Sequence, residues 1–316
     1  MQIESIAAID IGSNAIRLLI NNAEEYEPGR ALKKNAYIRV PVRIGEDVFA
    51  KGLISPDKTE KLKGTMRAFV QLMQVFGVRC YRACATSAMR EAANGPEVVK
   101  DIFDSTGLKI EIISGAEEAD LIFAAGSLID LMQPGQNYLH VDVGGGSTEV
   151  VVYSDGRKQD AISFPIGTLR ILAGAVTRET KLDMESKLSA IKEKYRPNEI
   201  IASGGNINKT LKLLGGKDGD TIGLARLERF HRELAALTVE ERLEQYKMNH
   251  YRADVIVPAL YIFSTVGRLC NASRITIPKV GLVDGIIRTL YQGCALDPQA
   301  AAHLPAHAVP DGGGRG

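Results

Sequence analysis

Two stretches of the sequence place an aspartate, glycines and hydroxyl residues between runs that favour β-strands. Residues 7–20 read AAIDIGSNAIRLLI, and residues 139–152 read LHVDVGGGSTEVVV. Each predicts a β-hairpin whose tip follows an aspartate, Asp10 in the first hairpin and Asp142 in the second. A hairpin turn needs one or two glycines, and the second tip carries three in succession. Because N–H groups around glycine form nests for anions, we expect two phosphate-binding tips that face each other across an interdomain cleft.

The residues of these tips are the predicted phosphate-binding groups. They are Gly12, Ser13 and Asn14 in the first tip, and Gly144, Gly145, Gly146, Ser147 and Thr148 in the second. Two arginines are further candidates, because a planar guanidinium donates two parallel hydrogen bonds to a phosphate. Arg17 follows the first tip, and Arg90 follows a predicted strand. A solvated arginine without a ligand remains the alternative at both positions.

Carboxylates at the tips predict a site for Mg²⁺. Asp142 and Glu149 stand at the two ends of the second tip, where a hairpin allows both to face one cation. Mg²⁺ takes one or two carboxylates together with water and phosphate oxygens, which fits this pair. Asp10 at the first tip is a third candidate for contact with the metal or with water. The alternatives are a turn-capping role for either aspartate and a solvated strand position for Glu149.

The segment SGAEEA, residues 114–119, predicts the start of a helix with two adjacent glutamates. Ser114 is a suitable N-cap, and Glu117 three residues later completes a capping box by accepting the Ser114 N–H. Glu118 is rotated by about 100° around the helix and is free to face elsewhere. A helix N-terminus favours the ionised carboxylate, as a general base for water requires. In the alternative, both glutamates only stabilise the first turn.

The order of elements predicts an α/β fold with two similar domains, because strands come first and a strand–helix alternation follows in each half. The predicted strands are 3–11, 16–22, 35–44, 78–86, 109–114, 138–143, 148–153, 157–164, 199–203 and 274–278. The predicted helices are 56–76, 87–93, 95–107, 168–175, 184–195, 206–214, 223–237, 252–271 and 281–292. We place the N-terminal domain at 1–125 together with a final helix near 285–298, the C-terminal domain at 126–284, and a disordered tail at 299–316.

Composition narrows the class of protein. The 316 residues are 45% hydrophobic and 24% charged, with a net charge of +1, so no overall basic surface predicts binding to a nucleic acid polymer or a membrane. The sequence has no apolar run of membrane-spanning length and no secretory signal pattern at its start. We therefore expect a cytoplasmic protein whose four cysteines are reduced thiols.

The paired hairpins resemble the phosphate loops of the actin, sugar kinase and heat-shock ATPase superfamily. A closer resemblance is to the exopolyphosphatase / guanosine pentaphosphate phosphohydrolase (Ppx/GppA) family. Five segments carry it: AAIDIGSNAIRLLI, ATSAMREAANG (85–95), ISGAEEADLIFAAG (113–126), HVDVGGGSTEVVVY (140–153) and IIASGGNINKTLKLLG (200–215). The resemblance implies two actin-like (ribonuclease H-like) α/β domains around a cleft. It also implies a Mg²⁺-dependent hydrolase that releases terminal phosphate from polyphosphate, guanosine pentaphosphate or both.

The same resemblance assigns roles to particular residues. It makes Glu118 the catalytic glutamate and Arg90 the basic contact, and it places Gly204 and Gly205 in a further ligand-binding segment. It also implies a homodimer. Longer family members carry a C-terminal helical domain, so we do not expect processive digestion of very long polyphosphate here. An ATPase or small-molecule kinase of the wider superfamily, or a non-catalytic nucleotide sensor, are the alternatives.

Overall fold

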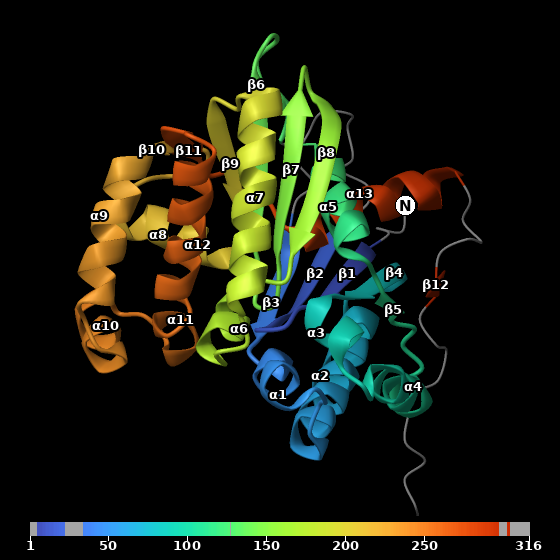
Figure 1. Cartoon of the computed structure of the whole chain (residues 1–316). Coiled ribbons are helices and arrows are strands. Elements are labelled where there is room, and N and C mark those ends of the chain that lie inside the picture. The colour runs from blue at the N-terminus through green and yellow to red at the C-terminus, as the bar shows by residue number, and fades with distance from the viewer. Residues whose placement is uncertain (1–4, 23–33, 127, 297–301, 304–316) are drawn as a thin grey trace, which may run out of the picture.

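The computed structural model describes residues 5–22, 34–126, 128–296 and 302–303, and its strands form two mixed sheets (Figure 1). The first sheet consists of β1 (Ser5–Ile11), β2 (Ile16–Asn22), β3 (Lys34–Val40), β4 (Val78–Ala85), β5 (Glu111–Ile112) and β12 (Ala302–His303). Its order is β12-β4-β1-β2-β3, and β5 pairs with β4. The second sheet consists of β6 (Asn137–Val143), β7 (Thr148–Ser154), β8 (Arg157–Phe164), β9 (Glu199–Ser203), β10 (Thr221–Gly223) and β11 (Arg274–Thr276). Its order is β10-β11-β9-β6-β7-β8.

Each sheet has its own set of helices. The first sheet is accompanied by α1 (Ile44–Lys51), α2 (Pro56–Val75), α3 (Ser87–Glu91) and α4 (Gly95–Thr106), and we call this group the N-terminal lobe. The second sheet is accompanied by α6 (Thr168–Leu172), α7 (Arg178–Tyr195), α8 (Gly205–Leu213), α9 (Leu224–Ala235), α10 (Val239–Tyr246), α11 (His250–Ala253) and α12 (Ile256–Leu269), and we call this group the C-terminal lobe. Helix α5 (Gly115–Ala124) packs against α13 (Leu282–Leu296), which in turn contacts β1, β2 and β4 (Figure 1). The last long helix thus lies on the first sheet, while the domain boundaries themselves stay a prediction.

The two sheets share one connectivity. In the first sheet, β1 pairs antiparallel with β2, β2 pairs antiparallel with β3, and β4 lies parallel to β1 on its other side. In the second sheet, β6, β7, β8 and β9 repeat this arrangement strand for strand. The similarity of the two hairpins in sequence therefore extends to whole sheets, and it places Asp10 and Asp142 near equivalent ends of the central strands β1 and β6.

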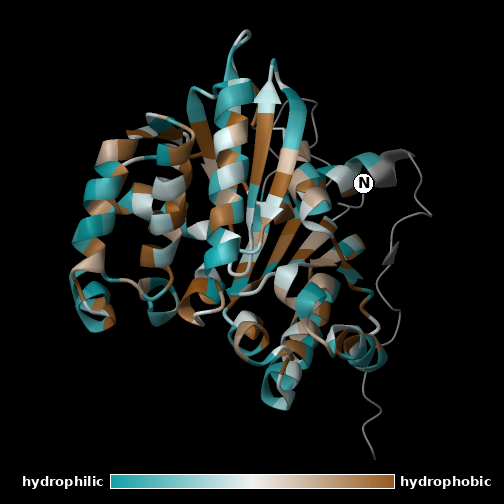
Figure 2. Ribbon diagram, viewed as in Figure 1, coloured by the Kyte–Doolittle hydropathy of each residue, from teal (hydrophilic) through white to brown (hydrophobic). Residues whose placement is uncertain are grey.

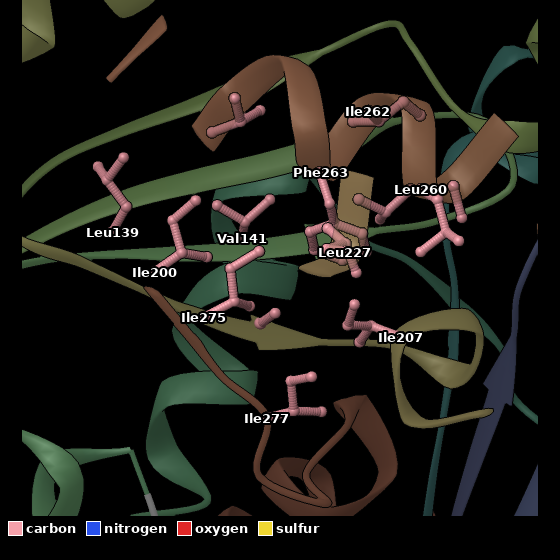
Figure 3. Close-up of a cluster of buried hydrophobic side chains, with 14 of the residues drawn as sticks. Leu139, Val141, Ile200, Ile207, Leu227, Leu260, Ile262, Phe263, Ile275 and Ile277 are labelled. Atoms are coloured by element: carbon pink, nitrogen blue, oxygen red, sulfur yellow. The ribbon is translucent and has the colours of Figure 1, made fainter. Parts of the chain in front are cut away.

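Hydrophobic packing explains why these segments form the sheets. All seven residues of β1 are buried, and the inner strands are mostly hydrophobic, whereas the surrounding helices turn hydrophilic residues outward (Figure 2). In the C-terminal lobe, Leu139 and Val141 of β6 and Ile200 of β9 belong to one hydrophobic cluster with Leu260 and Phe263 of α12 (Figure 3). Burial of such side chains is the main favourable term in folding. The strands are therefore rigid supports for the residues at their ends.

Several predicted elements differ in extent. The strand predicted at 35–44 ends at Val40, and the unpredicted helix α1 begins at Ile44 after Arg43, whose φ of 58° is left-handed. Helix α10 was also not predicted, although Thr238 and Glu241 form a capping box at its start. Helix α7 begins at Arg178 rather than 184, because Thr177 caps it. These segments are short or weakly periodic, so pattern alone does not reveal them.

Two residues of the segment 299–316, which was predicted to be a disordered tail, form a strand in the structure. Ala302 and His303 pair antiparallel with Tyr81 and Cys80 of β4 and so form β12, while the other residues of this tail lie outside the described ranges. Three of the cysteines, Cys80, Cys84 and Cys270, are buried free thiols, as predicted for them. No helix within the described ranges has the length and apolar character needed to cross a membrane.

Candidate active site

The two predicted tips meet at one cleft between the lobes. Its volume is about 280 Å³, and both tips line it together with Glu118 and with Gly204 and Gly205 at the start of α8. The tips are in direct contact, since a Cβ atom on Gly145 would lie only 2.9 Å from the Cβ atom of Ser13 and 3.3 Å from the backbone nitrogen of Asn14. The expected arrangement of two facing tips around a shared cleft is therefore present.

Close approach, rather than a left-handed backbone, explains the three consecutive glycines. None of the three has a positive φ. A Cβ atom on Gly146 would lie 2.3 Å from Phe49 Cζ and 2.3 Å from Ser87 Oγ, both in the N-terminal lobe. A Cβ atom on Gly167 would lie 2.5 Å from the backbone of Gly145. Any side chain at these positions would push the second tip away from its neighbours.

The tips offer backbone N–H groups to a ligand. The N–H groups of Gly12 and Gly144 close their own hairpins by donating to Ala15 O and Ser147 O. Several further N–H groups of the tips have no backbone acceptor in the part of the chain that the structure describes, among them those of Ser13, Asn14, Gly145 and Gly146. Open N–H groups at adjoining tips are suited to hold a phosphate.

Three carboxylates gather at the cleft, which Glu118 and Asp142 line and beside which Glu149 is buried. Glu118, Asp142 and Glu149 each have a carboxylate oxygen within 4.8 Å of the others. The strand register produces part of this group, because Asp142 of β6 lies opposite Glu149 of β7 and both side chains point to the same face. Glu118 reaches the group from the first turn of α5, where Ser114 Oγ accepts the N–H of Glu117 at 3.1 Å. The expected pairing of Asp142 and Glu149 toward one point is present.

These carboxylates hold their protons unusually strongly. Burial raises the pKa of Glu118 well above its usual value, and the charges of Glu149 and Asp142 raise it further. Burial and Asp142 raise the pKa of Glu149 to about 7, and burial also raises the pKa of Asp142. At Glu118, desolvation and like charges act against the helix dipole, so the pKa of Glu118 in the chain without a cation shifts in the direction opposite to the expected one.

Glu118 and Glu149 differ in their hydrogen bonds. Ser147 Oγ and Ser163 Oγ donate to Glu149 Oε1 at 2.7 and 3.0 Å, so this carboxylate is fixed in place. Glu118 Oε2 is buried and has no hydrogen-bond partner among the described residues. Glu118 is thus the member of the group with an oxygen free to take a proton or a ligand.

Asp10 and Arg17 occupy the first tip as an ion pair. They lie opposite each other in the β1–β2 register, and Arg17 Nη1 donates to Asp10 Oδ2. Both residues line the cleft. Asp10 lies outside the close group of three carboxylates, although its charge acts on Glu118. Its role as a metal ligand and the phosphate contact of Arg17 stay predictions.

Some expected contacts are made with other partners. Glu117 does not close a capping box, because its carboxylate forms an ion pair with Arg82 at 2.7 Å. Thr148 is fully buried and its hydroxyl donates to Ile166 O at 2.6 Å, so it does not face a ligand. Arg90 is exposed and donates from Nη1 to Ile113 O at 2.5 Å, outside the residues that line the cleft. Its positive charge nevertheless opposes the pKa rise of Glu118.

Three supporting residues were not predicted. Ser163 of β8 holds Glu149, and Ser203 of β9 donates to Asp142 Oδ1 at 2.6 Å. Arg170 of α6 donates from Nε to the carbonyl oxygen of Gly146 at 2.8 Å. Ser163 and Arg170 are far from any motif and carry no sequence signal. A signal for Ser203 was present in the sequence, because this residue ends a predicted strand immediately before Gly204, where the turn approaches the cleft.

The chain is similar in sequence to known phosphatases. The Ppx/GppA phosphatase family matches residues 31–292. Exopolyphosphatase 1 of Mycobacterium leprae is 26% identical over 310 residues, which cover 89% of this chain and 88% of that protein. Exopolyphosphatase 2 of Mycobacterium tuberculosis is 26% identical over 320 residues, which cover 92% and 99%.

A solved structure has a similar fold. The crystal structure of an exopolyphosphatase from Cytophaga hutchinsonii has a TM-score of 0.80 with this chain, at 24% identity, over 92% of this chain and 98% of that one. This likeness, with the repeated connectivity of the sheets, confirms the predicted fold of two actin-like α/β domains around a cleft. The family match covers most of the chain, and the chain therefore belongs to the Ppx/GppA phosphatase family.

Proposed function

We propose that the chain is a Mg²⁺-dependent exopolyphosphatase, which removes the terminal phosphate of inorganic polyphosphate. One observation carries the proposal: two glycine tips with open N–H groups adjoin at a cleft that Glu118 and Asp142 line, and the carboxylate of Glu149 lies close to both. The tips suit a phosphate, and the carboxylates suit a cation and a base. The similarity to exopolyphosphatases 1 and 2 over most of their length supports the substrate class.

Glu118, Asp142 and Glu149 fit Mg²⁺ by the chemistry of their donors. All their candidate ligand atoms are oxygens, which this hard cation prefers, and one of them, Glu118 Oε2, is buried without a partner among the described residues. Burial and, after it, the neighbouring negative charges raise the pKa values of Glu118 and Glu149, and a divalent cation would relieve the repulsion between these charges. When bound, Mg²⁺ supplies positive charge that neutralises the phosphoryl group during transfer.

The side chains and backbone of this chain perform the hydrolysis. The open N–H groups of the tips hold the oxygens of the terminal phosphoryl group. Glu118 takes a proton from a water molecule as the water oxygen attacks the terminal phosphorus. The bond from that phosphorus to the bridging oxygen breaks, so orthophosphate leaves and the polyphosphate is one unit shorter. Burial and the nearby carboxylates raise the pKa of Glu118, which makes its carboxylate a stronger acceptor for a proton of water.

Guanosine pentaphosphate is the second candidate substrate. Tyr37 lines the cleft and is 51% exposed, so its ring is open to stack on a purine base. Lys34 and Lys279 line the same cleft and form ion pairs with Asp284 and Asp218, so additional phosphates would compete with these aspartates for the positive charge. This part of the cleft supports binding of a nucleotide that carries several phosphates.

A substrate panel at fixed Mg²⁺ tests the proposal. We expect phosphate release from short and long polyphosphate to exceed release from ATP, with guanosine pentaphosphate measured beside them. Faster release from ATP would instead favour an ATPase of the wider superfamily. Binding of these compounds without turnover of any would favour a nucleotide sensor.

We also propose that the protein acts as a homodimer, as the family resemblance implies, and that it is located in the cytoplasm, as the composition of the sequence led us to expect. Analytical ultracentrifugation at micromolar concentration checks the first point, and fractionation of cells that express the chain checks the second. A single monomeric species across this concentration range contradicts the dimer.

A further inference from the structure

A chain of hydrogen bonds runs from the cleft into the interior of the C-terminal lobe. Ser203 Oγ lies 2.6 Å from Asp142 Oδ1, and His140 Nε2 lies 3.0 Å from Ser203 Oγ. Ser203 and His140 are fully buried, whereas Asp142 lines the cleft. One carboxylate of the acidic group is therefore held by two side chains that solvent does not reach.

Strand geometry brings the three side chains together. His140 and Asp142 are two residues apart on β6, so their side chains point to the same face of the sheet. Ser203 ends the parallel neighbour β9, where it lies opposite Asp142 in the register. The arrangement thus depends on two central strands and not on a loop.

The direction of each hydrogen bond follows from the chemistry of the groups. A hydroxyl carries one proton, and Ser203 Oγ uses it to donate to Asp142 Oδ1. Ser203 then accepts from His140, which places an imidazole proton on Nε2. The other nitrogen, Nδ1, is buried without a partner among the described residues.

The backbone after Ser203 encloses the same carboxylate oxygen. Gly204 has a φ of 109°, and a Cβ atom there would lie 3.1 Å from Asp142 Oδ1 and 3.3 Å from Val143 O. Asp142 Oδ1 is therefore packed against the turn and bonded to Ser203. Both contacts restrain the Oδ1 side of the carboxylate.

We propose that Ser203 is a positioning residue for Asp142, and that His140 fixes the direction of the Ser203 hydroxyl. Together they hold one oxygen of Asp142 so that the other is presented to the divalent cation. This inference rests on the proposed function, because it assigns a purpose to the cation site formed with Glu118 and Glu149. Neither residue touches substrate.

Binding of Mn²⁺ to the protein without substrate, followed by electron paramagnetic resonance, tests the inference directly. We expect Ser203→Ala to weaken Mn²⁺ binding by about tenfold, since it removes a hydrogen bond to a charged group. Turnover at saturating polyphosphate falls with it, by about tenfold, while KM for polyphosphate stays within about twofold. We expect His140→Leu to weaken Mn²⁺ binding by about threefold, because it acts through Ser203.

Conservative variants separate positioning from a general effect on folding. Ser203→Thr keeps a hydroxyl, and His140→Gln keeps a donor, so each restores most of the Mn²⁺ affinity that its partner variant loses. Ser264→Ala is the matched control, because Ser264 is also a buried serine but its hydroxyl has no partner among the described residues. It leaves Mn²⁺ affinity unchanged.

The outcomes distinguish two failures. If the wild-type chain binds Mn²⁺ and hydrolyses polyphosphate while Ser203→Ala does both equally well, the inference is overturned and the proposed function stands. If Ser203→Ala or His140→Leu is too unstable to purify, Ser203→Thr or His140→Gln is measured in its place. The inference requires that these variants keep their Mn²⁺ affinity, because they preserve the hydroxyl or the donor. If the wild-type chain binds no Mn²⁺, the cation site and the inference are both wrong.

Discussion

Two adjacent glutamates on α5 have opposite surroundings. Glu117 faces outward and pairs with Arg82, whereas Glu118 faces the cleft and the charges of Asp142 and Glu149. The sequence placed the second glutamate on a different side of the helix from the first, and the structure agrees. The partner of Glu117 was not predictable, because Arg82 comes from β4 and its approach depends on the packing of α5 against the sheet.

This difference makes the pair a matched test of catalysis. We expect Glu118→Gln to lower turnover of polyphosphate by about 10²–10⁴, since it removes the base for water. Binding of polyphosphate, measured by calorimetry, is retained. Glu117→Gln has the same change in side chain and serves as the control, with turnover within about twofold of wild type. Near wild-type turnover of Glu118→Gln contradicts its assignment as the base.

The pKa of Glu149 predicts how stability depends on pH. This pKa is about 7 in the folded chain, above the usual value of 4.5, so the unfolded chain releases the proton more readily. Without a divalent cation, stability is therefore greatest at low pH within this window and decreases as pH rises from about 4.5 to 7. Melting temperatures measured in chelator between pH 5 and 8 show this decrease.

Two controls identify the source of the effect. Saturating Mg²⁺ raises the melting temperature more at pH 8 than at pH 6, because protons compete for the same oxygens. Glu149→Gln reduces the slope in chelator, since it removes one of the titrating groups. A melting temperature that rises with pH in chelator contradicts the prediction.

At the scale of elements, the second tip depends on the absence of side chains. A Cβ atom on Gly146 would lie 2.3 Å from Phe49 and from Ser87. We expect Gly146→Ala to displace the tip and to lower kcat/KM for polyphosphate by at least about tenfold, because small misplacements of a reacting group are costly. Circular dichroism and steady-state kinetics check that the fold remains while activity falls.

Helix α2 provides the matched control for this substitution. Gly64 lies within α2, where nothing is within 4 Å of an added Cβ atom. Gly64→Ala should stabilise the chain by about 0.5–1 kcal/mol through helix propensity and leave kinetics unchanged. If both alanine variants behave alike, close packing is not the reason for the glycine at 146.

The helices, strands and turns also show which features of the fold and the site could be predicted from the sequence. Both hairpins, the cap of α5 and the facing tips were predictable, because turn residues, alternation and caps are local signals. The hydrogen-bond partners of Thr148 and Ser163 could not be predicted, because each is decided by a contact across the sheet or with a later loop. Helix α1 was missed for a related reason: it begins after a residue with positive φ and is held by contacts with α3 and α6. Local pattern therefore predicted the site's main residues, and tertiary packing decided their partners.

For the whole molecule, the cleft depends on how the lobes are held together. Two arginines bridge them. Arg43 of the N-terminal lobe bonds Asp254 of the C-terminal lobe at 2.5 Å. Arg170 of the C-terminal lobe bonds Glu91 at 2.5 Å and lies 4.2 Å from the centre of the Phe49 ring, both in the N-terminal lobe. Such bonds across an interface set the relative position of the two tips.

Arg170 joins this bridge to the active site, since its Nε also donates to the carbonyl oxygen of Gly146. We expect Arg170→Ala to lower kcat/KM by about tenfold, because the tip and the lobes lose a shared contact. Arg170→Lys should not restore activity, since an ammonium cannot replace a planar guanidinium that contacts a carboxylate, a carbonyl and a ring at once. Lys187→Ala, which removes an exposed ion pair with Asp183, is the control with unchanged kinetics. Small-angle scattering supplies the second measurement: an increased radius of gyration for Arg170→Ala places the effect in lobe separation. Wild-type kcat/KM in Arg170→Ala means that the remaining contacts, including Arg43 with Asp254, are sufficient to hold the cleft.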